Sequence, residues 1–343
     1  MRYYEIEVTG GGGENGDPNQ VFRQYTSHKN GVYNPGALMA EMDISRYTFD
    51  TPSQESRVSV WGVSPEVLQQ DILELVGKTI TVRGGMLGGL PLSREGKQGL
   101  IVRGTVLQVV GNWEGSQLRQ DFIIQASPTS SVSHEMVRLG PINLTLVWRA
   151  GVKLADALAQ CFTVLGRYQF VIDISDDLVL DYDSSMYCGD LNQLAVALNG
   201  ISQNILNRDS YYGVRFTFQG NTIYVYDGVG NAESDSKKPI TQIAFNELIG
   251  QPTWIKYGVV SLVMAMRSDM IVGNKILLPA NSRPIGISQS NSQLRDRLAF
   301  TGVFRITKVR FVGNSRDPNA ANWATIVEAI PEENIEVKKD AAQ

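Results

Sequence analysis

Two stretches of this chain carry the same series of landmarks in the same order, which is the sequence signature of a duplicated structural unit. The first stretch contains, in order, Val58-Ser59-Val60, Gly77-Lys78, Gly104, Val110-Gly111-Asn112 and Ala126-Ser127-Pro128. The second contains Val260-Ser261-Leu262, Gly273-Asn274-Lys275, Gly302, Val312-Gly313-Asn314 and Ala329-Ile330-Pro331. Gly77 and Gly104 are 27 residues apart, and Gly273 and Gly302 are 29 apart. We therefore expect one fold to occur twice.

Both stretches consist of short alternating or apolar runs separated by Gly, Pro, Asn and Ser, a pattern typical of β-structure. One helix is expected inside the first stretch, from Ser64 to Leu73, with Ser64 as N-cap and Pro65 in the first turn. Between the stretches, helices alternate with strands. One apolar helical face includes Leu154, Leu158 and Cys161, and a second helix follows Asp190. Strands are expected at 142–148, 168–174, 178–182, 212–218 and 222–226.

The predicted fold class is mainly β with an α/β insert, with two related β-barrel domains flanking a small α/β domain. A chain of 343 residues exceeds what one hydrophobic core usually serves. The expected domains are residues 1–130, the first β-barrel; 135–230, the α/β insert; and 239–331, the second β-barrel. The charged residues 332–343 are expected to form a mobile tail.

Each β stretch is interrupted by a long loop, and long loops in compact domains usually have a partner or a function. We expect these two loops to contact neighbouring subunits or neighbouring rings. The candidate assembly contacts are Gly84, Gly85, Met86, Leu87, Gly88, Gly89, Arg94 and Lys97 in the first loop, and Asn281, Arg283, Pro284 and Ile285 in the second.

Charge and hydropathy exclude several classes of function. The formal net charge of −4 and the absence of a basic stripe argue against sequence-specific nucleic-acid binding, although a mildly acidic wall is compatible with a conduit for DNA. The N-terminus has no apolar signal region and reads as a first strand. The longest apolar run, near 259–266, is far shorter than the roughly 20 residues of a bilayer span, so no transmembrane segment is expected.

No motif predicts a catalytic, cofactor or metal site. The glycine runs at 10–13 and 84–89 lack the Gly-Lys-Ser/Thr step of a phosphate-binding loop. His28 and His134 lie in expected loops without a nucleophile motif, and Cys161 and Cys188 are expected to be a buried thiol and a loop thiol. The acids Asp173, Asp176, Asp177, Asp181 and Asp183 lack the spacing of a calcium loop and are expected to be solvated turn residues. The five tryptophans are expected in cores or interfaces.

The duplicated Val-Gly and Val-Gly-Asn landmarks, in the order β unit, α/β insert, β unit, resemble the baseplate hub proteins of tailed bacteriophages, of the late-control-D type. The resemblance implies tail-tube-like β-barrels and a homotrimer that presents six similar domains around an axial channel. It also implies a structural, non-enzymatic role as a symmetry adaptor between the hexameric tail tube and the trimeric central spike. The implied partners are the tube protein, the spike protein, and further the tape-measure and other baseplate proteins. The implied location is the tail baseplate of the virion, assembled in the host cytoplasm.

Two other classes of function stay open at this point. In the first, a tail-associated protein binds a receptor or glycan through the α/β insert. In the second, a cell-wall hydrolase uses the aspartate cluster, and it would lose activity when Asp181 and Asp183 are replaced.

Overall fold

The computed structural model describes residues 1–10, 20–46, 55–87, 97–126, 143–166, 168–208, 211–219, 222–228, 240–256, 258–279 and 302–331. The fold is mainly β with a small α/β insert, as the sequence predicts. The expected tail, residues 332–343, and His134 lie outside the described residues.

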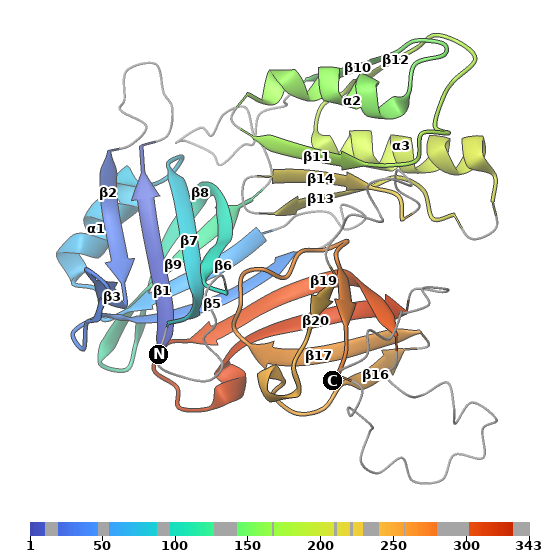
Figure 1. The fold of residues 1–343 in the computed structure, drawn as a ribbon. Coiled ribbons are helices and arrows are strands. Elements are labelled where there is room, and N and C mark those ends of the chain that lie inside the picture. Colours follow the sequence, from blue (N-terminus) through green and yellow to red (C-terminus); the bar gives the residue numbers. More distant parts are fainter. Residues whose placement is uncertain are drawn as a thin grey trace.

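Strands before the insert form the first part of the main sheet (Figure 1). They are β1 (Arg2–Thr9), β2 (Val21–Thr26), β5 (Met39–Arg46), β6 (Glu55–Trp61), β7 (Thr79–Met86), β8 (Gly99–Glu114) and β9 (Gln117–Gln125), with a separate small hairpin of β3 (His28–Lys29) and β4 (Val32–Tyr33). Helix α1 (Pro65–Glu74) begins as predicted, because the Ser64 hydroxyl accepts a hydrogen bond from the Val67 amide at 3.4 Å.

The described residues of the insert form two α-helices and two small sheets. Its elements are β10 (Leu144–Trp148), α2 (Leu154–Phe162), β11 (Gln169–Asp173), β12 (Ser184–Cys188), α3 (Leu191–Leu206), β13 (Arg215–Gln219) and β14 (Thr222–Tyr226), with a short 3-10 turn η1 (Thr163–Leu165). The Asp190 carboxylate caps α3 by accepting from the Gln193 amide at 2.7 Å, which confirms the predicted start of this helix.

One strand of the insert lies elsewhere than predicted. The segment 178–182 alternates apolar residues because Leu178 and Leu180 are buried, and their carbonyls accept from the amides of Leu154 and Gly151. The strand is instead β12, which pairs antiparallel with β10 and contains Cys188. Cys188 is therefore a buried strand residue and not a loop thiol.

The second β part follows the insert and continues the same sheet. Its elements are β15 (Thr241–Gln242), η2 (Phe245–Glu247), β16 (Thr253–Lys256), β17 (Val259–Ala265), β18 (Lys275–Leu277), β19 (Val303–Asn314), η4 (Ala320–Asn322) and β20 (Trp323–Pro331). The order of strands across the sheet is β16-β17-β20-β19-β5-β6-β9-β8-β7-β1-β2, with β18 joining β19 and β15 at the side.

The duplicated landmarks correspond to a repeated strand arrangement. The first strand set is defined as β7-β8-β9-β6 and the second as β18-β19-β20-β17, each in its order across the sheet. In the first set, the Gly77 amide donates to the Val106 carbonyl at 2.8 Å; in the second, the Gly273 amide donates to the Ile306 carbonyl at 2.8 Å. A register shift follows both residues, between Val106 and Gln108 and between Ile306 and Lys308. The two sets therefore share topology and bulge position.

The Val-Gly-Asn landmarks do not occupy equivalent positions. Gly111 lies five residues after Val106, whereas Gly313 lies seven residues after Ile306. Counted from the shared bulge, Gly111 is equivalent to Phe311, and Gly313 is equivalent to Trp113. The sequence alignment of these landmarks is thus wrong by two residues, because the spacing of a short motif does not report where the bulge falls.

The repeated turn gives a first prediction. Gly273 has φ +91°, a conformation that costs an L-residue roughly 1–2 kcal/mol, so Gly273→Ala should lower the free energy of unfolding by about that amount. The equivalent Gly77, at φ +83°, should behave alike. Urea denaturation measures the effect, with Gly166→Ala as control, because Gly166 has φ −52° and open space around its Cα. Equal stability of the Gly273 and Gly166 variants would contradict the prediction.

Candidate functional site

The two strand sets are joined edge to edge within the chain, and this junction is the candidate functional site. Strand β19 pairs with β20 along one edge, and residues 309–314 of its other edge pair antiparallel with β5. Val312 lies opposite Asp43, and Arg310 lies opposite Ser45. The Arg310 guanidinium donates to both Asp43 carboxylate oxygens at 2.7 and 2.6 Å. The junction is therefore a continuous antiparallel ladder.

A buried arginine lies where the two halves meet. Arg46, the last residue of β5, is 5% exposed and stacks over the Phe311 ring at 4.7 Å. Its guanidinium donates to the carbonyls of Leu100 at 3.1 Å and Met270 at 3.2 Å, and also to that of Ile101. Burial lowers the pKa of this guanidinium to about 10, which still leaves it charged at neutral pH. Arg46 thus ties β5 to β8 and to the second half of the chain.

A buried ionic cluster forms a second tie between the halves. Glu247 accepts from the Lys97 ammonium with one oxygen and from the Arg267 guanidinium at 2.9 Å with the other. Arg267 also pairs with Asp269 at 2.5 Å. Although burial alone would raise the pKa of Glu247, its hydrogen bond to Lys97 and the charge of Arg267 outweigh burial and lower it. The cluster therefore holds ionised groups in a nearly dry contact.

The N-terminal strand holds the turn that follows β19. The Arg2 guanidinium donates to the carbonyls of Asn314 and Asn319, each at 2.7 Å, and to that of Asp317. Next to it, the Arg316 guanidinium donates to the Ala37 carbonyl at 2.5 Å. The turn after β19 is thus held against the first half of the chain by Arg2 and by Arg316.

The structure places part of the predicted assembly loops in this junction. Gly84, Gly85 and Met86 end β7, and the Leu87 amide donates to the Met1 carbonyl at 2.8 Å. The Gly85 carbonyl accepts from the Trp323 indole at 2.9 Å, and Lys97 pairs with Glu247. These residues contact the same chain; a role toward other subunits stays a prediction. Outside the described residues lie Gly88, Gly89, Arg94, Asn281, Arg283, Pro284 and Ile285.

Sequence reasoning missed Arg46, Glu247 and Arg267, although one signal was available. Met42, Ile44 and Arg46 share one face of β5, and the first two are buried. A charged residue at the buried phase of a strand predicts a specific buried partner set. No such pattern exists for the other two residues. Glu247 lies in the 3-10 turn η2, and Arg267 lies two residues after the end of β17.

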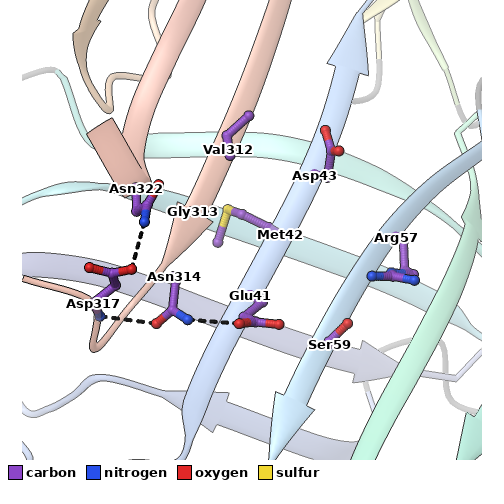
Figure 2. Close-up of a pocket in the computed structure, with 10 residues that line it drawn as sticks. All are labelled: Glu41, Met42, Asp43, Arg57, Ser59, Val312, Gly313, Asn314, Asp317 and Asn322. Atoms are coloured by element: carbon purple, nitrogen blue, oxygen red, sulfur yellow. Dashed lines mark hydrogen bonds between the residues drawn. The ribbon is translucent and has the colours of Figure 1, made fainter. Parts of the chain in front are cut away.

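A shallow polar pocket lies on the junction, on the sheet face opposite the core (Figure 2). Its volume is about 320 Å³, and it spans β5, β6 and the end of β19. The Asn314 amide donates to Glu41 at 2.7 Å, and Asn322 donates to Asp317 at 2.5 Å. The remaining lining residues are Met42, Asp43, Arg57, Ser59, Val312 and Gly313. The lining includes three acids and Arg57, and Arg310 pairs with Asp43, so the face is polar and its charges are partly balanced.

The residues weighed for catalysis are dispersed. Asp176 pairs with Lys153 at 3.0 Å, Asp177 with Arg208 at 3.2 Å, and Asp183 accepts from the Ala150 amide at 2.8 Å. Within the described ranges, no three His, Cys, Asp or Glu residues come together as a metal site would require. His28 packs between the rings of Tyr3, which is tilted against it, and Tyr33, which meets it edge to face. Burial raises the pKa of the Cys161 thiol to about 11.

The tryptophans divide between cores and surface. Trp148 and Trp323 are buried, whereas Trp113, next to the β8–β9 turn, is 73% exposed. Among the helices described, none is long and apolar enough to cross a membrane.

Comparisons with known proteins give a likeness of fold. No family model matches the chain, and its sequence matches no curated protein. The structure is similar to that of the 43 kDa tail protein of prophage MuSo2 from Shewanella oneidensis, with a TM-score of 0.50 and 8% identity over 96% of this chain and 98% of that one. The tail protein of Neisseria meningitidis MC58 aligns with a TM-score of 0.47 and 10% identity over 96% and 97%. The fold of this chain is thus that of a solved phage tail protein over nearly its whole length.

Proposed function

We propose that this chain is a structural, non-enzymatic phage tail protein that forms a trimeric hub of the baseplate. In the virion, the hub joins the hexameric tail tube to the trimeric central spike and keeps an axial channel open. Its partners are two further copies of itself, the tube protein and the spike protein, together with tape-measure and other baseplate proteins.

The observation that carries this proposal is the repeated strand set joined edge to edge by β5 and β19. One copy supplies two similar sets in one continuous sheet. Three copies around a threefold axis supply six sets, which approximates the sixfold symmetry of a tube. The same ring keeps true threefold symmetry, because the two sets differ in sequence, and so matches a trimeric spike.

The polar face of the junction supports the axial channel. The face opposite the core bears Asp43 paired with Arg310, and it carries Arg57 and Ser59 nearby. Paired acids and arginines leave little excess positive charge to hold phosphates. A channel lined by this face would let nucleic acid pass without strong binding.

The mass of the purified protein in solution tests the proposal. Light scattering should give about three 37.8 kDa chains, and negative-stain images of the same peak should show six lobes around a hole. Mixing with tube or spike protein should give a larger complex. A chain that stays monomeric, alone and with both partners, would overturn the hub. Clearing of peptidoglycan or retention of a glycan by that monomer would favour an enzymatic or receptor-binding role.

A further inference from the structure

We propose that strand β16 of one copy pairs antiparallel with the outer edge of β8 in the next copy, with Thr253 opposite Asn112. This inference rests on the proposed function, because it names the contact by which the copies would close into a ring. It repeats between chains the β5–β19 junction that each chain contains once.

The two edges required are present at corresponding places. Strand β8 pairs with β7 as far as Thr105, and beyond that residue β9 is its strand partner among those described. Strand β16 is the last strand at one end of the sheet order, whereas β8 lies inside the order, between β9 and β7. An open edge of backbone donors and acceptors is a template for another strand. The end of β8 past its pairing with β7, and strand β16, therefore provide one edge from each half of the chain.

The internal repeat fixes the equivalent of β19 in the first half. The bulges after Val106 and Ile306 make Val110 equivalent to Arg310, and Asn112 equivalent to Val312. In the observed junction, Arg310 lies opposite Ser45 and Val312 lies opposite Asp43. The outer edge of β8 should accordingly receive the equivalents of Ser45 and Asp43.

The same repeat identifies the equivalent of Asp43 in β16. The first paired residues after the two bulges are Gln108, opposite Ile123, and Lys308, opposite Glu328. On their other edges, Ile123 lies opposite Arg57, and Glu328 lies opposite Ser261. On the other side, Arg57 pairs with Asp43, and Ser261 pairs with Thr253. Thr253 is thus equivalent to Asp43. The register of β16 shifts between Trp254 and Lys256, so the equivalence is fixed at Thr253 and is not extended past the shift. Strand β16 holds the place in the second half that β5 holds in the first.

Exposed apolar side chains flank both edges. Ile255 on β16 is 45% exposed, and Phe245 in η2 is 64% exposed. Met264 and Val60 are equivalent, because each lies three residues after the equivalent pair Ser261 and Arg57. Leu248 forms a bridge with Met264, and Ala40 pairs with Val60, so Leu248 is equivalent to Ala40. Three residues earlier, Phe245 is equivalent to Ala37. In the observed junction, Ala37 contacts Arg316 in the turn after β19. Phe245 should therefore meet the turn after β8 in the next copy.

That turn presents a matching apolar surface. Trp113 is 73% exposed and borders a cleft of about 630 Å³ that Leu38, Val63 and Leu118 also line. Exposed aromatic residues beside a cleft are frequent anchors of protein interfaces. Because the two surfaces are different and come from different halves of the chain, the contact is heterologous. Such contacts generate rings when the rotation closes.

Cysteine cross-linking tests the register. The double variant Asn112→Cys/Thr253→Cys, treated with diamide, should give two-chain and three-chain species on non-reducing gels that disappear with reductant. The matched control is Arg103→Cys/Thr253→Cys, because Arg103 is also on β8 but lies in the half already paired with β7. The native Cys161 and Cys188 are buried. The control should remain a single-chain band.

A second variant tests the apolar contact without a cross-link. Phe245→Asp should weaken self-association at least about tenfold, whereas Tyr187→Asp, which changes an 82% exposed residue of the insert, should leave it unchanged. Trimers that form normally but do not cross-link through Asn112 and Thr253 would overturn this pairing and leave the hub intact. Failure of the unmodified chain to associate, alone and with tube protein, would overturn both.

Discussion

Replacing Arg46 by methionine is expected to lower the free energy of unfolding by about 3–5 kcal/mol. Methionine fills similar space but leaves the carbonyls of Leu100, Ile101 and Met270 without the donor that they have now. Each buried acceptor left unsatisfied costs about 1–3 kcal/mol, and the ring of Phe311 loses its cation. Guanidinium denaturation followed by tryptophan fluorescence measures the loss.

The control is Arg310→Met, which removes an arginine of the same junction. Arg310 and Asp43 are both about half exposed, and exposed ion pairs contribute about 0–1 kcal/mol. If the free energy of unfolding falls by the same small amount in both variants, Arg46 does not stabilise the junction, and the backbone pairing of β5 with β19 alone joins the halves. A much larger loss of unfolding free energy in Arg46→Met than in Arg310→Met would show that the buried Arg46 guanidinium stabilises the junction.

The helix starts and the strand alternation followed well from sequence because their signals are local. Ser64 and Asp190 start helices through their own side chains, and the alternation in β6 and β17 reports which face is buried. Self-similarity then indicated the duplication, whose Gly77 and Gly273 turns do coincide. Patterns that depend on neighbours in sequence are thus visible without a structure.

The junction was not predictable in the same way. The pairing of β5 with β19 joins residues more than 260 positions apart, and nothing in either strand encodes its partner. The mistaken strand at 178–182 has a related cause: Leu178 and Leu180 alternate because they pack on the insert core, not because they pair with a strand. The assembly loops were chosen by length, and length does not report that Lys97 reaches Glu247 within the chain.

The other large effect is expected at Glu247. Glu247→Gln keeps the shape but removes the negative charge between Lys97 and Arg267, so two cations remain in a nearly dry contact. Removing one partner of a buried ion pair costs about 3–5 kcal/mol. The matched control is Glu328→Gln, which removes the partly exposed partner of Lys308 and should cost less than about 1 kcal/mol.

The pH dependence of the same variant separates charge from shape. The pKa of Glu247 is lowered in the folded protein, so its ionisation stabilises the fold above its ordinary value of 4.5, and this contribution is lost as the pH falls through the folded value. The wild-type and Glu247→Gln proteins should therefore differ most at neutral pH and converge in acid. Denaturation midpoints between pH 3 and pH 7 measure this, with buffers of constant ionic strength. A difference that is the same at every pH would show that Glu247 acts through packing and hydrogen-bond geometry, and that the tie between the halves does not depend on its charge.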